Sequence, residues 1–493
     1  MNAASDGLFL EFVNADIRKG SSTLFKDFTW KIYNNQQWAI VGPTGSGKTS
    51  LAEAIIGKNF IEKGRVHYYF LNKHKLPNGF ITLSDYISYL SFKEDVHIIN
   101  YDNLYYQQRY NTREAEDVIT VEQYFNMFIS YADEDRRNKI FKLFNINELL
   151  PLQFVKLSNG QTRKVLIART LLKNPLLLIL DNPFTGLDTE SRKILINIID
   201  NLIAVEGIKI ILITGTDELP KNITHVLQLD NFTINETYSR EDYEGRKKNS
   251  TIANSAVTIR FEELDEQNFD IAAQLNHVTV RYDEKVVLDN VNWTVKKGEK
   301  WALLGANGSG KTTLLSLINA DHPQSYANDI VLFDKKRGTG ESIWDIKKKI
   351  GFLSPELHLY FPKQLNAFEV AATGFFEKLY GNRQLTQKEK DLISHLFNYF
   401  SLESVLTKNF SLLSTGEQRI ILFIRALVKN APLLILDEPY QGLDALIIDK
   451  CQRLLSYYAQ SNRTIIFVSH YKDEIPSFIT RYIYLENGKA KLS

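Results

Sequence analysis

The 493-residue chain contains a single cysteine, Cys451, and carries almost no net charge, with 59 Lys and Arg residues against 58 Asp and Glu residues. One cysteine excludes a disulfide framework, a cysteine-rich zinc site and iron–sulfur ligation, and it fits a reducing compartment. The balanced charge gives no global electrostatic signature of nucleic-acid binding. Because neither His nor Cys stands near Cys451 in the sequence, we expect this thiol to be structural.

Long apolar runs are also missing, since none reaches the roughly 18 residues that a membrane span needs. The first residues lack the basic and then apolar segments of a secretion signal, so a cytoplasmic protein is expected. Hydrophobic residues make up 44% and charged residues 24% of the chain, which excludes wholesale disorder and indicates buried cores. A length of 493 residues predicts two or three domains at about 150 residues each.

The sequence is an internal duplication. The text WAIVGPTGSGKTSLAEAIIG, beginning at Trp38, returns as WALLGANGSGKTTLLSLINA from Trp301. A second stretch, LSNGQTRKVLIARTLLKNPLLLILDNPFTGLD from Leu157, returns as LSTGEQRIILFIRALVKNAPLLILDEPYQGLD from Leu413. Two homologous domains of similar organisation therefore follow one another along the chain. The simplest role for the two tryptophans is in the core.

The domain boundaries follow from the repeats. We predict a first domain over residues 1–235, a linker over residues 236–271 and a second domain over residues 272–493. The linker is mixed in charge, with one short strand expected at Val257–Phe261. In each domain apolar strands alternate with helical segments, which predicts an α/β fold with a mostly parallel sheet.

Each domain carries a phosphate-binding loop. Gly42–Thr49 and Gly305–Thr312 both fit G-x-x-x-x-G-K-[ST], after an apolar strand and before a helix. Glycines let successive N–H groups and the helix N-terminus face phosphates, the lysine reaches the β and γ oxygens, and the threonine hydroxyl ligates Mg²⁺. A chance match is expected about 0.01 times in a chain of this size. Two matches in register predict two nucleotide sites.

Two apolar runs, Leu176–Asp181 and Leu433–Asp437, end in a carboxylate. Such a run is typical of a buried parallel strand that delivers an acid to the magnesium at its carboxyl edge. By itself an apolar run is more often only core. Because both runs stand at matched distances from a phosphate loop, we assign Asp181 and Asp437 to metal binding.

The motif Leu-Ser-x-Gly-[Gln/Glu], LSNGQ in the first domain and LSTGE in the second, makes the chain resemble the ATP-binding cassette (ABC) family. The resemblance implies two P-loop NTPase domains, each with a mostly parallel sheet core, an antiparallel edge sheet and a helical subdomain. It also implies that the domains pair head to tail around two ATP molecules, so that each signature closes on the γ-phosphate held by the other domain. For either serine alone, an N-cap without a ligand is the alternative.

The expected nucleotide-binding residues come from the two loops, the two signatures and one aromatic side chain. They are Gly42, Gly45, Gly47, Lys48, Thr49, Ser158, Gly160, Tyr282, Gly305, Asn307, Gly308, Gly310, Lys311, Thr312, Ser414 and Gly416, with Thr49, Asp181, Thr312 and Asp437 on Mg²⁺.

The resemblance implies that the two sites differ. Glu438 stands where the family polarises the attacking water, and His470 where it contacts the γ-phosphate. The first domain has Asn182 and Gly215 at these positions, with Thr214 and Thr216 beside the glycine. An amide orients water but cannot accept its proton, and losing a general base costs about 10²- to 10⁴-fold in rate. We expect one competent ATPase site and one degenerate site that binds ATP.

Tyr282 stands where the family has an adenine-stacking aromatic, with core packing as the alternative. The matching first-domain position is Lys19, next to Arg18, and both cations fit a solvated face better than a stack.

The family's Q-loop glutamine, which couples nucleotide state to the partner in transporters, is Phe92 in one domain and Pro355 in the other. Glu356 stands beside Pro355 as a weak substitute. Ordinary transport coupling is therefore in doubt.

Residues 321–361 are similar to the ModF family of tandem cassettes, also called PhrA. This resemblance implies an ATPase subunit for a separate membrane permease, for example an importer of molybdate or a related oxyanion, peripheral on the inner face of the membrane. A soluble ABC ATPase acting on ribosomes or nucleic acid is the alternative. The short linker of mixed charge and the sequence EPYQGLD argue against a ribosome factor, and the neutral charge offers no support for nucleic acid. The aromatic stretch at 101–110 is either a docking surface or, more simply, a packed loop.

Overall fold

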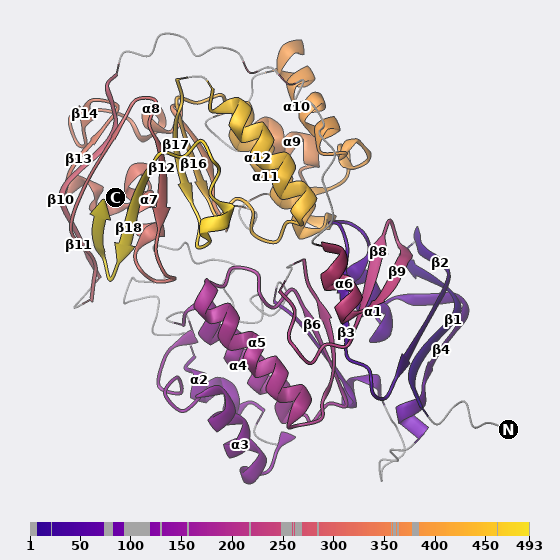
Figure 1. The fold of residues 1–493 in the computed structure, drawn as a ribbon. Coiled ribbons are helices and arrows are strands. Elements are labelled where there is room, and N and C mark those ends of the chain that lie inside the picture. The colour runs from indigo at the N-terminus through magenta and orange to yellow at the C-terminus, as the bar shows by residue number, and fades with distance from the viewer. Residues whose placement is uncertain are drawn as a thin grey trace. The chain divides into compact units, whose positions relative to one another are not determined.

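The computed structural model describes residues 7–20, 22–72, 82–92, 119–128, 131–154, 157–215, 218–247, 259, 261, 269–282, 285–355, 357, 361, 364–376, 384–460 and 462–492 (Figure 1). The chain divides into two compact units, Met1–Ile252 and Ala253–Ser493. The 101–110 stretch, Thr216 and Glu356 lie outside the described residues. Of the predicted linker strand, only Ile259 and Phe261 are described, and neither lies in a strand.

The first unit combines a six-stranded sheet with a three-stranded antiparallel sheet. The six-stranded sheet has the order β5-β6-β7-β3-β8-β9 and is parallel except for β9, while the smaller sheet has the order β2-β1-β4. Its strands are β1 (Leu8–Lys19), β2 (Ser22–Tyr33), β3 (Trp38–Val41), β4 (Phe60–Tyr68), β5 (Ile87–Ser91), β6 (Leu177–Asp181), β7 (Lys209–Ile213), β8 (His225–Asp230) and β9 (Thr233–Ser239). Its α-helices are α1 (Lys48–Ile55), α2 (Val121–Asn126), α3 (Glu134–Phe144), α4 (Asn159–Leu172), α5 (Thr189–Ala204) and α6 (Arg240–Lys247).

The second unit repeats this plan. Its six-stranded sheet has the order β15-β16-β17-β12-β18-β19, and its antiparallel sheet the order β11-β10-β13-β14. The strands are β10 (Ile271–Tyr282), β11 (Lys285–Lys296), β12 (Lys300–Leu304), β13 (Asp329–Leu332), β14 (Lys335–Lys336), β15 (Ile350–Leu353), β16 (Leu433–Asp437), β17 (Thr464–Val468), β18 (Arg481–Glu486) and β19 (Lys489–Leu492). The α-helices are α7 (Lys311–Ile318), α8 (Ile343–Lys347), α9 (Ala367–Ala372), α10 (Gln387–Tyr399), α11 (Thr415–Val428) and α12 (Ala445–Tyr458).

The predicted fold class is confirmed, and strand periodicity explains its layers. Side chains along a strand alternate between the two faces of a sheet. Ile179 of β6 therefore joins the cluster formed with β1, β2 and α1, whereas Leu178 and Leu180 join the cluster formed with α4 and α5 (Figure 1). Both faces are covered, so β6 and β16 are apolar throughout until the carboxylate at their last position.

The first unit continues past residue 235. Strand β9 runs to Ser239 and is followed directly by α6, whose Arg240 side chain donates to the Lys221 carbonyl and forms an ion pair with Glu244. These elements occupy the start of the range that the sequence assigned to the linker. The mixed charge of this segment gave no indication of the short, highly charged helix α6, which packs next to the edge of the sheet.

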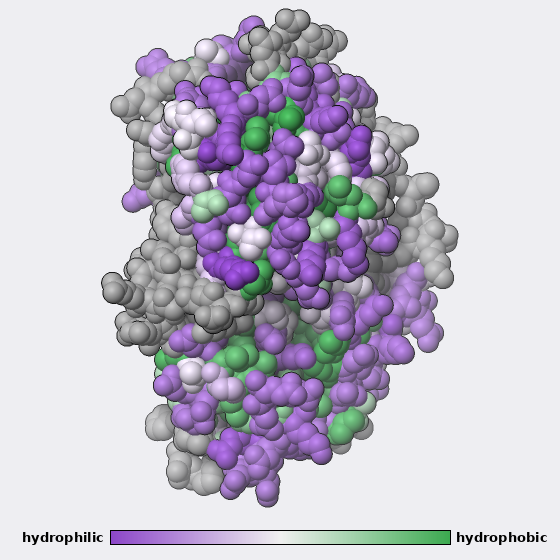
Figure 2. All heavy atoms as spheres, turned by 90° about the vertical axis from the view of Figure 1, so that its left-hand side faces the viewer, coloured by the Kyte–Doolittle hydropathy of each residue, from purple (hydrophilic) through white to green (hydrophobic). Residues whose placement is uncertain are grey.

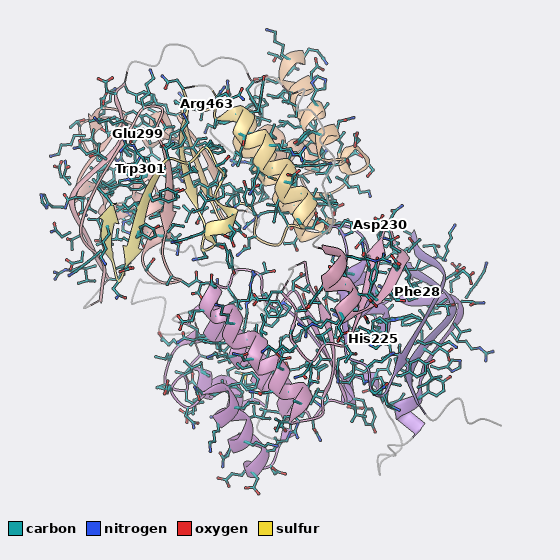
Figure 3. All side chains as sticks on the ribbon, in the orientation of Figure 1. Phe28, His225, Asp230, Glu299, Trp301 and Arg463 are labelled. Carbon is teal, nitrogen blue, oxygen red and sulfur yellow. The ribbon has the colours of Figure 1, made fainter. Side chains whose placement is uncertain are left out.

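The tryptophans at the start of β3 and β12 are core residues that also carry one polar contact each. Trp38 and Trp301 are both 4% exposed. The Trp301 Nε1–H donates to Glu299 Oε2 at 2.8 Å, and Trp38 donates to Gln36 Oε1 at 3.1 Å. Figure 3 labels Trp301 and Glu299 in the second unit. The paired indoles show that the duplication extends to details of the core.

The antiparallel sheet of the second unit presents a mainly hydrophilic surface. Figure 2 views this side, and hydrophobic side chains are scattered there among hydrophilic ones. Lys335 and Lys336 of β14 are both exposed. Cys451, in contrast, is fully buried on α12, and burial raises its pKa well above that of an ordinary thiol. A structural role for this cysteine fits that position.

Candidate nucleotide sites

The first phosphate loop joins β3 to α1. Gly45 and Gly47 have φ angles of 83° and 97°, a backbone region that glycine adopts at little cost. The Lys48 Nζ lies over the loop and donates to the carbonyls of Gly42 and Pro43, both at 2.7 Å. The lysine is thereby held at the mouth of a loop whose helix N-terminus is suited to an anion.

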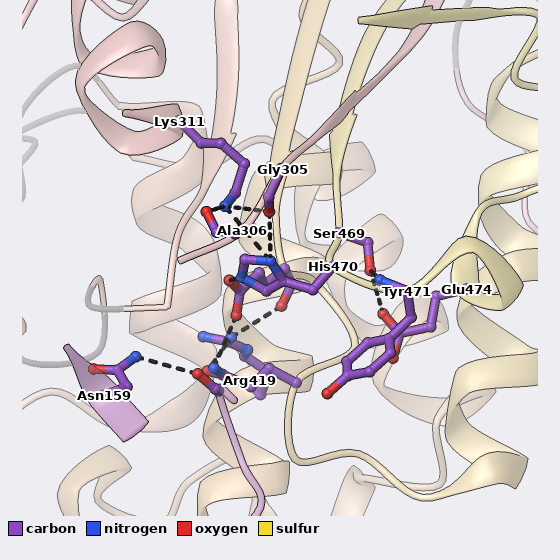
Figure 4. Close-up of polar contacts among 12 residues, drawn as sticks. Asn159, Gly305, Ala306, Lys311, Arg419, Ser469, His470, Tyr471 and Glu474 are labelled. Carbon is purple, nitrogen blue, oxygen red and sulfur yellow. Dashed lines mark hydrogen bonds and ion pairs between the residues drawn. The ribbon is translucent and has the colours of Figure 1, made fainter. Parts of the chain in front are cut away.

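The second loop, between β12 and α7, has the same form. Gly308 and Gly310 have φ angles of 79° and 105°, and Lys311 Nζ donates to the carbonyls of Gly305 and Ala306, both at 2.9 Å (Figure 4). Asn307 lies within this loop, half-buried, beside the exposed Gly308. The structure thus brings the predicted residues of each loop together.

The first glycine of each loop is required by a close approach to a neighbouring strand. A Cβ at Gly42 would lie 2.1 Å from the Leu229 carbonyl oxygen, and one at Gly305 would lie 2.4 Å from the Leu485 carbonyl oxygen. Real Cβ atoms do not approach backbone that closely. Any other residue would push the loop away from the sheet.

Asp181, at the end of β6, accepts from three neutral donors. Thr49 Oγ1 and the Tyr89 hydroxyl donate to its Oδ2 at 2.8 and 3.0 Å, and Asn182 Nδ2 donates to its Oδ1 at 2.8 Å. Burial, and then the charge of Asp181, raise the pKa of Tyr89, so this hydroxyl stays a donor. The adjacent hydroxyl and carboxylate of Thr49 and Asp181 are oxygen ligands of the kind Mg²⁺ takes.

The second unit places two carboxylates at the end of β16. Burial, and then the neighbouring charge of Glu438, raise the pKa of Asp437 to about 7. Burial also raises the pKa of Glu438, but its hydrogen bond to His470 and the charges of His470 and Lys311 outweigh that and lower it. In the described part of this unit, Thr312 is exposed and makes no hydrogen bond to Asp437. The hydrogen bond and the positive charges around Glu438 thus favour its ionised form.

His470 connects the general-base position with the phosphate loop. Its Nε2 lies 2.5 Å from Glu438 Oε1, and its Nδ1 lies 2.9 Å from the Gly305 carbonyl oxygen and 3.5 Å from Lys311 Nζ (Figure 4). One imidazole therefore touches the loop, the carboxylate and the lysine. In the first unit the corresponding positions hold the buried Thr214 and the exposed Gly215, neither of which has a side chain that spans this distance.

The turns that follow β6 and β16 share one unusual backbone conformation. Asn182 has a φ of 53° and Glu438 a φ of 47°, both in the left-handed region. Each backbone N–H donates to the neighbouring strand, Asn182 to Ile213 at 2.8 Å and Glu438 to Val468 at 2.9 Å. Asparagine tolerates this region, whereas glutamate rarely adopts it. The carboxylate of Glu438 is therefore held at a strained position.

The signature serines cap the helices α4 and α11. Ser158 Oγ accepts from Gln161 N at 3.2 Å, and Ser414 Oγ accepts from Glu417 N at 3.3 Å. Gly160 and Gly416 lie in the first turns of these helices. Capping is the structural role that the sequence left open, and it leaves the remaining N–H groups of the first turn directed outward.

Tyr282 ends β10 beside a buried histidine. Its hydroxyl lies 2.7 Å from His322 Nε2, and the two rings meet edge to face at 5.9 Å. The first unit has ion pairs in place of this tyrosine–histidine pair. Lys19 Nζ lies 2.8 Å from Glu53 Oε2, and Arg18 lies 2.9 Å from Glu62. Tyr282 is half-buried and keeps part of its ring accessible, whereas its first-unit counterpart offers no aromatic face.

Protonation of His322 is expected to destabilise the second unit. Gln324 N donates to its Nδ1 at 3.1 Å, so the neutral ring carries its proton on Nε2, and burial lowers the pKa of His322. The unfolded chain, with a pKa of about 6.5, binds the proton first as pH falls. The contribution of neutral His322 to the free energy of unfolding is therefore fully present above about pH 6.5. Below that pH the free energy of unfolding falls, by at most about 1.4 kcal/mol per pH unit for one proton.

Thermal unfolding at pH 7.5 and pH 5.5 measures this effect. His322→Asn, which introduces the residue found at the matching position 59, should shrink the loss of Tm between the two pH values, while His395→Asn on the exposed face of α10 should not. An unchanged pH response in His322→Asn would contradict the assignment. His225 in the first unit, whose pKa burial also lowers, accounts for part of the remaining response.

Three further groups in the sites escaped the sequence analysis. Tyr89 on β5 donates to Asp181, whereas its counterpart Phe352 has no hydroxyl. The difference between ISYLS and IGFLS at this position is a sequence signal for the extra hydroxyl. Arg163 stacks on Phe92, the residue at the Q-loop position, at 4.7 Å. Arg419 donates to Ser354 O at 3.4 Å, next to the Q-loop position Pro355. An arginine on the signature helix thus reaches the Q-loop in each unit.

A family model described as ABC transporter matches residues 25–185 and 288–441. An uncharacterised ABC transporter ATP-binding protein of Schizosaccharomyces pombe is 33% identical over 98% of each chain. This chain belongs to the ABC transporter family. ABC transporter ATP-binding protein ModF of Escherichia coli is 34% identical over 90% of each chain. The resemblance to the tandem ModF cassettes is therefore confirmed.

A dimeric ATP-binding cassette solved in a post-hydrolysis state with ADP and Pi is 26% identical and covers 45% of this chain and 97% of its own, with a TM-score of 0.40. Because the family model matches a segment of each unit, each unit is one cassette of a tandem ABC ATP-binding protein. Membership of the family implies ATP hydrolysis, normally with Mg²⁺. Among the described helices, none combines the length and apolar character that crossing a bilayer requires.

Proposed function

We propose that this tandem cassette hydrolyses ATP at the site built on Lys311 and Glu438, and that the site built on Lys48 binds ATP with slow turnover or none. The observation that carries this proposal is the contact of 2.5 Å between His470 Nε2 and Glu438 Oε1. It joins a carboxylate of lowered pKa to an imidazole that also touches the phosphate loop.

In the proposed mechanism Glu438 accepts the proton of the attacking water. His470 orients the carboxylate through one ring nitrogen and lies within reach of a γ-phosphate beside Lys311. Lys311 exchanges its bonds to Gly305 and Ala306 for phosphate oxygens. A bound Mg²⁺, held by Thr312 and Asp437, would neutralise the charge that develops on the phosphates.

The first site lacks the proton acceptor. The Asn182 amide donates to Asp181 Oδ1, and an amide oxygen does not take up a proton near neutral pH. Lys48, Thr49 and Asp181 retain the groups that bind phosphate and metal. This combination supports nucleotide binding without efficient turnover.

We propose further that the two cassettes pair head to tail, so that each site is completed by the signature helix of the other cassette. The first turn of α11, with Ser414 and Gly416, would then face the ATP on Lys48, and that of α4, with Ser158 and Gly160, the ATP on Lys311. Helix N-termini with free N–H groups support this assignment, since they favour an anion.

For the biological role we propose an energising subunit for a separate membrane permease, with an oxyanion such as molybdate as the substrate class. The name and the 34% identity of the ModF relative support it. The chain would act in the cytoplasm and associate with the inner face of the membrane through its partner. Pro355 and Phe92 at the Q-loop positions imply that coupling to this partner differs from the usual glutamine-based form.

Trapping the chain in its ATP-bound state tests the proposed role as a permease subunit. Glu438→Gln protein should hold ATP without turnover, and with ATP, but not with ADP, it should sediment with a polytopic membrane protein from detergent-solubilised cells. The same permease, reconstituted with the wild-type chain, should raise its ATPase rate. Recovery with ribosomes or nucleic acid instead would overturn the transport role and leave the ATPase assignment intact.

A further inference from the structure

Both carboxylate oxygens of Glu438 have a defined partner. Oε1 contacts His470 Nε2 at 2.5 Å, and Oε2 accepts a hydrogen bond from Gln441 Nε2 at 2.9 Å. Gln441 lies in the turn three residues after the carboxylate, where its backbone N–H donates to the Glu438 carbonyl at 3.2 Å. Two side chains from different segments therefore fix the carboxylate from both sides.

A buried arginine determines which end of the Gln441 amide faces the carboxylate. Arg419 Nη2 donates to Gln441 Oε1 at 2.9 Å. Guanidinium groups only donate, so this end of the amide must be oxygen and the opposite end, toward Glu438, must be the NH₂ group. The arginine therefore selects the orientation in which the amide donates to the carboxylate.

Arg419 itself is held by the backbone on both sides of the site. It is 5% exposed, and its Nη2 and Nη1 donate to the carbonyls of Glu438 and Ser354 at 3.0 and 3.4 Å. It comes from α11, Gln441 from the turn after β16, and Ser354 from the end of β15. The contacts of Arg419 thus join α11, the turn after β16 and the end of β15.

The first unit keeps the arginine and lacks the rest of this chain of contacts. Arg163, at the position of Arg419, donates to the backbone carbonyls of Asn182, Pro183 and Thr185. Thr185 stands at the position of Gln441 and does not reach the side chain of residue 182 by any hydrogen bond among the described residues. The side-chain amide therefore occurs in the unit that has a carboxylate to orient.

We propose that Gln441 is a positioning residue for Glu438, which it holds, under the control of Arg419, in the orientation that accepts a proton from water. This inference rests on the proposed function of Glu438. A carboxylate with one oxygen on His470 alone can rotate about its side-chain bonds, and displacements of about 1 Å cost up to about 10²-fold in rate. We expect Gln441→Thr to lower kcat by about 10- to 100-fold and to leave KM for ATP nearly unchanged.

The variant Gln441→Glu distinguishes a role of residue 441 in positioning Glu438 from a role that only holds Arg419 in place. The substituted carboxylate still accepts from Arg419, so a purely structural role for residue 441 predicts a rate near that of the wild type. Positioning predicts the opposite, since a carboxylate oxygen would replace the N–H donor 2.9 Å from Glu438 and repel it. We expect Gln441→Glu to be at least as slow as Gln441→Thr.

The experiment measures kcat, KM and Tm of the full-length chain for Gln441→Thr, Gln441→Glu and the matched first-unit variant Thr185→Ala. Slow Gln441 variants with unchanged KM and Tm, beside a Thr185→Ala variant of normal rate, support the inference. Wild-type rates in Gln441→Glu overturn it. The double variant Glu438→Gln, Gln441→Thr should be no slower than Glu438→Gln, because both changes affect one group.

Failure of the inference and failure of the proposed function give different results. If Glu438→Gln is inactive and both Gln441 variants are fully active, Gln441 has no positioning role and the ATPase assignment remains. If Glu438→Gln is itself active, the general base lies elsewhere and the assignment of Gln441 falls with it.

Discussion

Glu438→Gln is expected to reduce the steady-state ATPase rate by about 10²- to 10⁴-fold, because it replaces the proposed proton acceptor by an amide of almost the same shape. His470 and Gln441 both contact this side chain, so its volume is preserved while its basicity is lost. The left-handed backbone is equally strained with glutamine, which keeps the turn unchanged. A phosphate-release assay on the full-length chain measures the rate.

Two controls make this result specific. Glu403→Gln, an exposed carboxylate on the second unit, should leave the rate at the wild-type value. The affinity of Glu438→Gln for ATP, measured by equilibrium dialysis, should equal that of the wild type. A rate in Glu438→Gln within a few-fold of the wild type would assign the proton transfer to another group and remove the distinction between the two sites.

Lys311→Ala is expected to weaken ATP binding at the second site on the order of 10²-fold and to abolish turnover with it. The ammonium group contacts the Gly305 and Ala306 carbonyls and lies 3.5 Å from His470, so it stands where the β and γ oxygens of ATP are expected. Truncating one partner of a buried charged contact costs about 2–5 kcal/mol. Binding stoichiometry at micromolar ATP should fall from two to one.

Lys48→Ala is the matched comparison. It removes the corresponding contacts to Gly42 and Pro43 and should reduce the stoichiometry in the same way, while turnover falls far less than in Lys311→Ala. The two variants therefore separate binding from hydrolysis. Equal loss of turnover in both would mean that both sites hydrolyse ATP or that hydrolysis at one strictly requires ATP at the other.

Residues that act through local sequence were predictable. The phosphate loops depend on glycines and a lysine within eight positions, and the strand ends at Asp181 and Asp437 depend on an apolar run that two covered faces require. The residues that determine such features are consecutive in the sequence, so the physical reason for each can be read locally.

Contacts between distant segments were not predictable from one sequence. His322 lies 40 positions from Tyr282, and Gln441 lies 22 positions from Arg419, so each pairing depends on how strands and helices pack. Tyr89 reaches Asp181 across neighbouring parallel strands. The helix over Arg240–Lys247 was missed because its charged residues carry almost no apolar periodicity.

The left-handed turn also bears on how the two copies diverged. At one turn the backbone holds asparagine, which fits it, and at the other glutamate, which conflicts locally with the conformation that the fold imposes. Strain of this kind is of order 1–3 kcal/mol. Exchange of the acid for asparagine would therefore relieve this backbone strain, and the reverse exchange would introduce it. In this turn one copy therefore holds a residue that agrees with its backbone, and the other holds a residue whose local preference conflicts with it.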